Sequence, residues 1–138
     1  MVILYSGCFF DIDASEILRQ HRAGRELEKS IESLHVTVCY APKTIPADLL
    51  GEPVTVTVTG YGNDGVNEGY AVRLHAENEA LQELLSKIEV PHITLSRAKK
   101  GRSVDTRYLE FSPVESFTVT GRFGVYEKSL GPLTQIPG

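Results

Sequence analysis

Two short segments of the chain place a histidine and a threonine two residues apart between apolar residues. One segment reads Leu-His-Val-Thr-Val and the other reads Pro-His-Ile-Thr-Leu. Successive side chains of a β-strand point to opposite faces, so His35 and Thr37 share one face, as do His92 and Thr94. Each segment therefore presents an imidazole and a hydroxyl side by side.

Two imidazoles and two hydroxyls suit the cleavage of a phosphodiester. That reaction needs one proton taken from an attacking hydroxyl or water and another given to the leaving oxygen, and histidine can do either near neutral pH. Threonine hydroxyls can donate hydrogen bonds to the non-bridging phosphate oxygens. We therefore predict His35 and His92 as general acid and base, in an order that the sequence does not assign, and Thr37 and Thr94 as phosphate-binding groups.

The elements that must position these residues occur twice in the order strand, helix, strand, over residues 2–40 and again over residues 70–96. In the second helix, apolar residues recur on one face from residue 77 to residue 88. The first helix is charged, and Asp13 with Glu16 resembles a capping pair at its start. If the halves pack about an approximate two-fold axis, the two His-x-Thr strands become neighbours and share one cleft.

The remaining segments favour antiparallel strands. Valine and threonine alternate over residues 54–60, and a glycine-rich turn at residues 62–65 leads to a returning strand. This glycine-rich segment lacks the Lys and Ser/Thr of a P-loop. A long β-like segment covers residues 114–127. The sequence thus predicts an α+β, two-lobed fold with antiparallel sheets, helices packed outside and a central cleft.

Composition limits the possible functions. The chain has 138 residues and a formal charge of −4, which argues for one domain over residues 1–138 and against a protein that tracks along a nucleic acid. A short anionic substrate remains possible. Cys8 and Cys39 lie in apolar strands and are predicted to be buried free thiols. With no leader and no apolar span, we expect a cytoplasmic monomer without membrane contact.

With two His-x-Thr motifs on strands that follow helices, the chain resembles the two-histidine (2H) phosphoesterase superfamily. That group includes ligase-T-like RNA phosphoesterases, cyclic phosphodiesterase domains of tRNA ligases, and phage proteins that destroy cyclic-nucleotide signals. The resemblance implies metal-independent, cofactor-free attack on a 2′,3′-cyclic phosphate or on a short or 2′-5′ linked oligonucleotide. The residues that match the family motif are His35, Thr37, His92 and Thr94.

Several other interpretations remain open at this point. The substrate could be a cyclic di- or trinucleotide messenger, or the cleft could bind a nucleotide without cleaving it. A metal hydrolase could use His35, His92 and His75, although the acidic residues lack metal-ligand spacing. The two motif histidines could also be core residues with satisfied hydrogen bonds. We interpret His21 and His75 as solvated structural residues.

Four further residues are candidates for substrate binding. Tyr5 and Tyr126 could stack on a nucleobase, ahead of Tyr40, whose place in its strand puts it on the face opposite His35. Ser96 shares the face of the second motif and could donate another hydrogen bond. Arg97 begins a basic stretch that could close over a phosphate, although a solvated loop explains the stretch equally well.

Overall fold

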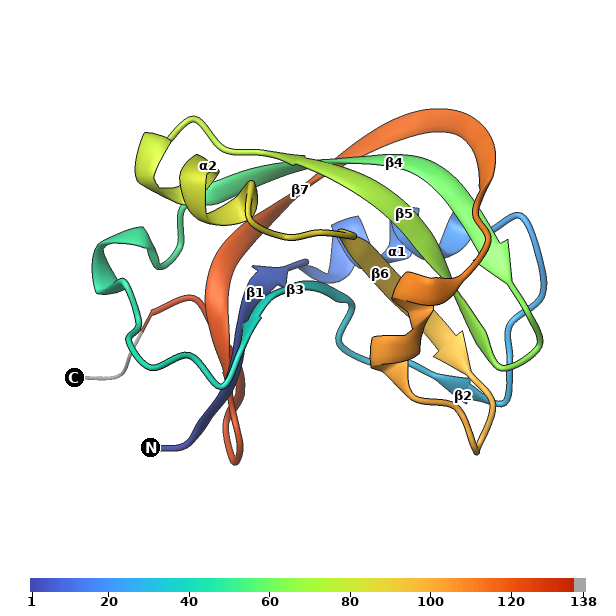
Figure 1. The fold of residues 1–138 in the computed structure, drawn as a ribbon, viewed down its shortest axis with the longest axis horizontal. Helices are drawn as coiled ribbons and strands as arrows, with labels where there is room; N and C mark the ends of the chain where they lie inside the picture. The colour runs from blue at the N-terminus through green and yellow to red at the C-terminus, as the bar shows by residue number, and fades with distance from the viewer. Residues whose placement is uncertain (136–138) are drawn as a thin grey trace.

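A computed structural model describes residues 1–135 of the chain (Figure 1). This part is an α+β fold in which eight antiparallel strands form one sheet. None of its helices is long and apolar enough to cross a lipid bilayer. In chain order, the elements are β1 (Ile3–Phe9), α1 (Ile12–Gln20), β2 (Lys29–Ser30), β3 (His35–Tyr40), the 3-10 helix η1 (Ala47–Leu49), β4 (Pro53–Asn63), β5 (Asn67–His75), α2 (Glu79–Leu85), β6 (His92–Arg97), the 3-10 helix η2 (Ser103–Tyr108), β7 (Ser112–Glu127) and β8 (Gly131–Leu133).

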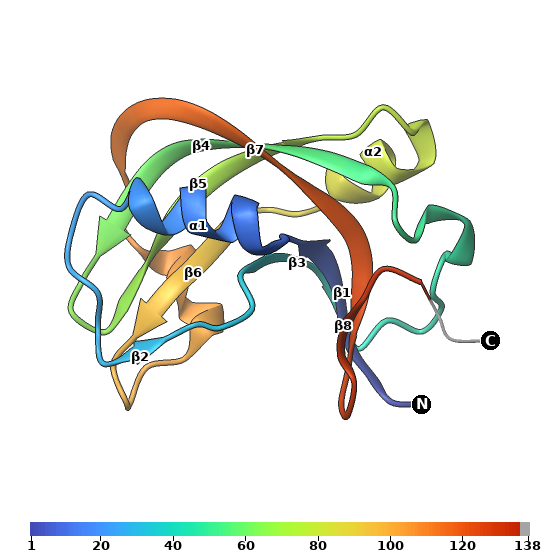
Figure 2. The same cartoon turned by 180° about the vertical axis from the view of Figure 1, so that it is seen from behind.

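The long strand β7 connects the two parts of the sheet. Its first part pairs with β4 as far as Arg122, and its last six residues, from Arg122 to Glu127, pair with β1. The sheet order is β2-β6-β5-β4-β7-β1-β3, so β3 and β6 are far apart along the sheet. They nevertheless contact each other, and Figures 1 and 2 show them close together in views from both sides. The sheet therefore bends until strands from its two parts meet.

The predicted order of strand, helix, strand occurs twice, as β5-α2-β6 and as β1-α1-β3 with the short strand β2 between α1 and β3. The two strands of each unit pair antiparallel with each other. Each helix begins at a residue whose side chain accepts a backbone hydrogen bond: Asp11 from Ala14 N at 2.8 Å, and Asn78 from Leu81 N at 3.1 Å. The predicted cap at Asp13 is wrong by two residues, because Asp13 lies inside the first turn of α1.

The spacing of Ile17, Leu18, Leu27 and Ile31 predicts an irregular helical stripe, which Gly24 could break in two. The first helix is shorter than this stripe. It ends at Gln20, and the chain then runs as a loop to β2, so Ile31 is not part of α1. A side chain at Gly24 would lie only 2.5 Å from the Tyr61 hydroxyl, so the loop passes close against β4. The Ile31 amide donates to the Leu95 carbonyl. Contacts with β4 and β6 therefore override the weak helical pattern of this segment.

The β4–β5 hairpin is confirmed. Val54, Val56 and Val58 are fully buried, and their side chains form the centre of the core. In the turn, the Asp64 carboxylate accepts hydrogen bonds from two backbone amides, which lowers the pKa of that carboxyl group. Cys8 is buried as predicted, but the prediction is wrong for the exposed thiol of Cys39, since β3 is the last strand of the sheet order.

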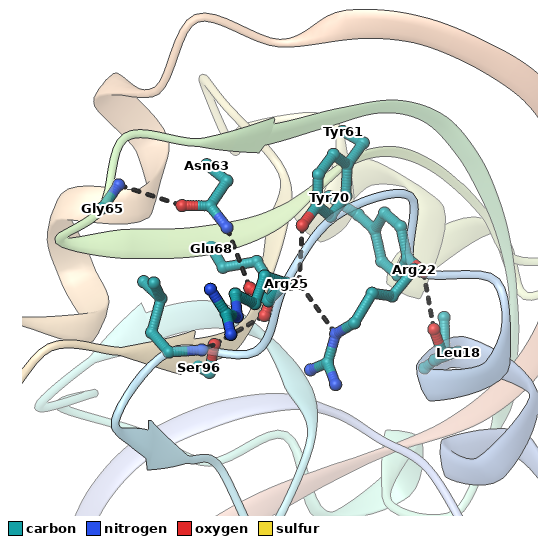
Figure 3. Close-up of polar contacts among 10 residues, drawn as sticks. Leu18, Arg22, Arg25, Tyr61, Asn63, Gly65, Glu68, Tyr70 and Ser96 are labelled. Atoms are coloured by element: carbon teal, nitrogen blue, oxygen red, sulfur yellow. Dashed lines mark hydrogen bonds and ion pairs between the residues drawn. The ribbon is translucent and has the colours of Figure 1, made fainter.

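A buried carboxylate joins the loop after α1 to three strands (Figure 3). One oxygen of Glu68 accepts from Arg22 Nε at 2.7 Å and from the Tyr61 hydroxyl at 2.6 Å. Its other oxygen accepts from the Ser96 hydroxyl at 2.5 Å. Glu68 is fully buried in β5, the strand beside β6. This network fixes the back of the strand that carries the second His-x-Thr motif.

We predict that Glu68→Ala lowers the free energy of unfolding by about 3–5 kcal/mol, because it leaves the Arg22 charge and two hydroxyls without their buried partner. Urea denaturation measures the loss. The control is Glu110→Ala, which removes an exposed carboxylate and should change stability by about 0.5 kcal/mol or less. Equal losses in the two variants would contradict the structural role assigned to Glu68.

Candidate active site

The structure brings the two His-x-Thr motifs to one small cleft. His35, Thr37, His92 and Thr94 line it, together with Tyr40 and Ser103. The first two side chains come from β3 and the second two from β6, the strands that meet where the sheet bends. Both histidines are partly buried and Thr94 is buried, so the cleft holds its polar groups at the edge of the core.

The two imidazoles are held in the same way. Nδ1 of His35 lies 2.9 Å from the Ser33 carbonyl oxygen, and Nδ1 of His92 lies 2.9 Å from the Val90 carbonyl oxygen. A carbonyl oxygen can only accept, so Nδ1 carries the proton in both rings. Nε2 of each neutral ring is then the nitrogen left to take a proton, which is the arrangement that a general base needs.

Burial lowers the pKa of both histidines, because it disfavours the charged imidazolium. The carbonyl hydrogen bonds act in the opposite direction and partly offset this effect. The positive charge of His92 further lowers the pKa of His35, and Arg107 does the same to His92. The rings are therefore close enough for the protonation of one to affect the other, as an acid and base pair requires.

A glycine faces the threonine of each motif on the neighbouring strand. Gly7 pairs with Thr37 and Gly69 pairs with Thr94, in both cases next to an irregularity in strand register. A methyl group on Gly7 would lie 2.7 Å from the carbonyl oxygen of the residue between His35 and Thr37, and one on Gly69 would clash with the corresponding carbonyl of β6. The two halves therefore share a close strand approach that the sequence analysis did not find.

The two threonines differ in their surroundings. The Thr94 hydroxyl donates to the Ser103 carbonyl at 2.9 Å and lies 2.7 Å from the Thr106 hydroxyl, which accepts from Asn67 Nδ2 at 3.0 Å. The consistent direction of donation runs from Asn67 through Thr106 to Thr94. Within residues 1–135, no hydrogen bond engages the Thr37 hydroxyl. Thr37 is thus free to donate into the cleft, and Thr94 is oriented by η2.

The two predicted aromatic platforms lie beside the histidine of the first motif. The Tyr5 ring stacks on His35 with centroids 4.8 Å apart, and Tyr126 stacks on Tyr5 at 5.1 Å. Because β1 lies between β3 and β7, these neighbours cover Tyr5 from two sides. Neither tyrosine lines the cleft. Their positions support the His35 ring and do not favour contact with a nucleobase.

The positions of Ser96 and Arg97 do not support their predicted substrate contacts. Ser96 is fully buried, donates to Glu68 and accepts from the Leu27 amide. A register irregularity beside Glu68 interrupts the alternation on which its predicted face depended. Arg97 donates to carbonyls of its own loop, including that of Gly101 at 3.1 Å, and so closes the basic stretch on itself.

Tyr40, which the sequence placed on the opposite face, lines the cleft. On β1, Gly7 pairs with Thr37 and the preceding residue pairs with Cys39, so Val38 is the extra residue of a bulge. The bulge reverses the side-chain alternation and brings Tyr40 to the His35 face. Counting alternate residues along the sequence could not predict the face of Tyr40, because a bulge depends on how two strands pair.

A second cleft of about 420 Å³ adjoins the first and shares Thr37, Tyr40 and His92 with it. Its other walls include Arg107 and Tyr108 from η2, which sequence reasoning missed. An adjacent arginine and tyrosine shortly after the second motif were the available signal. The Arg107 guanidinium lies over the Tyr108 ring at 4.7 Å.

The described residues contain no group of three or more His, Cys, Asp or Glu side chains that could hold a metal ion. His75, the third histidine of the metal interpretation, lies outside both clefts and pairs with Glu77 at 3.3 Å. No protein-family model matches the chain, and neither does any curated protein.

We predict that Thr106→Val lowers the free energy of unfolding by about 1–3 kcal/mol, because one buried N–H of Asn67 loses its acceptor and the Thr94 hydroxyl loses its donor. The substitution keeps the shape of the side chain. Thr118→Val, the same change at an exposed position of β7, is the control and should have an effect of about 0.5 kcal/mol or less. Denaturant titration of both variants checks this, and an equally small change in Thr106→Val would contradict the hydrogen-bond chain.

Proposed function

We propose that the protein is a metal-independent phosphodiesterase of the 2H type, which cleaves a 2′,3′-cyclic phosphate or a short or 2′-5′ linked oligonucleotide. The observation that carries this proposal is the matched placement of two imidazoles at one cleft. Each imidazole has Nδ1 bound to the carbonyl two residues earlier and a threonine beside it. A pair of hydrogen-bonded core histidines would not need to share an open cleft.

The chemistry follows from the two free Nε2 atoms. One neutral imidazole takes a proton from water as its oxygen attacks phosphorus. The bond from phosphorus to the leaving ribose oxygen breaks, and the other imidazole, already protonated, gives its proton to that oxygen. In the next cycle solvent restores the original protonation. Both lowered pKa values are compatible with this exchange in mildly acidic to neutral solution.

The threonines would bind the phosphoryl oxygens. Thr37 can donate directly. Thr94 can donate when its hydroxyl turns from the Ser103 carbonyl to the phosphate, while it continues to accept from Thr106. A donor chain of this kind polarises its last hydroxyl and strengthens the hydrogen bond that it donates.

The matched strand registers support an internal duplication of the kind that the 2H resemblance implies. Gly7 with Thr37 and Gly69 with Thr94 repeat one local geometry, and β1-α1-β3 repeats the order of β5-α2-β6. The proposal includes a cytoplasmic monomer that acts on a small nucleotide or short oligonucleotide, with no cofactor. The bend between the two halves supplies the central cleft.

Experiments can distinguish the proposed activity from other substrates, from nucleotide binding without catalysis, and from metal-dependent hydrolysis. Cyclic di- or trinucleotide messengers offer the same phosphodiester, so they belong in the substrate panel. A binding module without catalysis would bind these nucleotides without turning them over. A metal hydrolase would lose activity in EDTA, whereas the proposed acid and base are both imidazoles.

We predict that His35→Ala and His92→Ala each reduce the rate of phosphodiester cleavage by about 10²–10⁴-fold, because each removes one proton-transfer group. The assay follows adenosine 2′,3′-cyclic phosphate, a 2′-5′ linked diadenylate and a cyclic dinucleotide by chromatography in the presence of EDTA. His75→Ala is the matched control, since His75 is exposed and outside both clefts. It should retain the wild-type rate.

The proposal fails if the wild-type protein cleaves none of these substrates. It also fails if either motif variant remains about as active as His75→Ala while folded. Circular dichroism of each variant separates a loss of chemistry from a loss of structure.

A further inference from the structure

The larger cleft has the features of a site for a nucleoside next to the reacting phosphate. It is continuous with the histidine cleft through Thr37, Tyr40 and His92. Two tyrosines line it, Tyr40 from β3 and Tyr108 from η2, and these side chains are 55% and 72% exposed. An exposed aromatic face beside a phosphate site is a surface on which a nucleobase can stack.

Apolar side chains complete the walls between these tyrosines. Val38, Ile88, Val90 and Val104 line the cleft, and Val90 is 40% exposed. An open cleft of about 420 Å³ with aromatic and aliphatic walls suits a flat, partly apolar group. A phosphate group bound at the two histidines would leave these aromatic and aliphatic walls exposed to solvent.

Three charged side chains also line the larger cleft. Lys87 follows α2, Arg107 belongs to η2, and Glu89 is the single acid among them. Within residues 1–135 neither Lys87 nor Arg107 forms an ion pair. Two cations and one anion leave a net charge of +1 while His92 is neutral. One phosphodiester, with a charge of −1, complements that charge.

The histidine cleft already accounts for the reacting phosphate, so the two unpaired cations point to another anion. We infer that the larger cleft binds a nucleoside carrying a second phosphodiester, with the base against Tyr108 or Tyr40 and that phosphodiester at Lys87 and Arg107. This inference rests on the proposed phosphodiesterase function and narrows its substrate class. The preferred substrate is then an oligonucleotide or cyclic dinucleotide rather than a mononucleoside cyclic phosphate.

Two probes with the same reacting group test this preference. One is adenosine 2′,3′-cyclic phosphate, and the other is the dinucleotide ApA with a terminal 2′,3′-cyclic phosphate, which adds one phosphodiester. We expect kcat/KM for the dinucleotide to be about tenfold higher or more, the size typical of hydrogen bonds to a charged group. The advantage should shrink at high salt, because these cations are exposed.

Substitutions of residues that line the larger cleft test whether the preference for the dinucleotide arises there. Lys87→Gln should remove most of the dinucleotide's advantage, because it should lower kcat/KM for the dinucleotide far more than for the mononucleotide. Tyr108→Leu should weaken binding of both probes by about 5- to 100-fold, because both contain a base that can stack. Lys100→Gln removes an exposed cation that lies outside both clefts and is the control. It should change neither probe.

Equal kcat/KM for the two probes would overturn the inference, as would an equal loss for both probes in Lys87→Gln. Binding of both probes to the His35→Ala variant, measured by calorimetry, separates this inference from the proposed function. The dinucleotide could bind more tightly in a way that depends on Lys87 while the wild type turns over neither probe. That result would support the second phosphodiester site and contradict the proposed phosphodiesterase function. Turnover of both probes by the wild type, with no difference in their binding, would support the phosphodiesterase function and contradict the second phosphodiester site.

Discussion

The contact between β3 and β6 is the constraint on which the candidate site depends. These strands are remote in the sheet order, and they meet because β7 pairs first with β4 and then with β1 as the sheet bends. Neither His-x-Thr motif could form a two-histidine cleft alone. Each contributes one imidazole and one hydroxyl, and only the bend makes them a single chemical unit.

Buried polar groups hold the two strands in different ways. Behind β6, Glu68 accepts hydrogen bonds from Arg22, Tyr61 and Ser96, and beside it Asn67 supports Thr94 through Thr106. β3 has aromatic support instead, since Tyr5 stacks on His35. Such buried networks are costly when incomplete, so they favour one arrangement of the strands. The two motif strands therefore share a local pairing geometry but are stabilised by different side chains.

Local patterns in the sequence predicted most of the elements, because they reflect the two-residue period of strands and the 3.6-residue period of helices. The β4–β5 hairpin, α2 and the strands of both motifs lie where these patterns placed them. The short strand β2 and the end of α1 at Gln20 were missed, since contacts with β4 and β6 determine them. The sequence pattern also did not predict the bulge at Val38, which determines the face on which Tyr40 lies.

The same distinction applies to the candidate site. The His-x-Thr spacing identified His35 and His92, because alternation within one strand is a local property. The surroundings of Tyr5, Ser96 and Arg97 depend on neighbouring strands and loops, and the structure places all three outside the cleft. Arg107 and Tyr108 come from η2, whose position against β6 is a tertiary contact that no local pattern specifies.

The decisive test of two-histidine catalysis is the dependence of kcat/KM on pH, measured with adenosine 2′,3′-cyclic phosphate in EDTA. In the proposed mechanism the active form has one neutral and one protonated histidine, and burial lowers the pKa of both below the usual 6.5. As pH rises above the upper apparent pKa of the pair, both rings become neutral and the acid is lost; below the lower one, both are protonated and the base is lost. Acid and base catalysis by these two histidines predicts a bell-shaped profile with its maximum below pH 6.5. A rate that is absent, independent of pH, or still rising above pH 8 would contradict it.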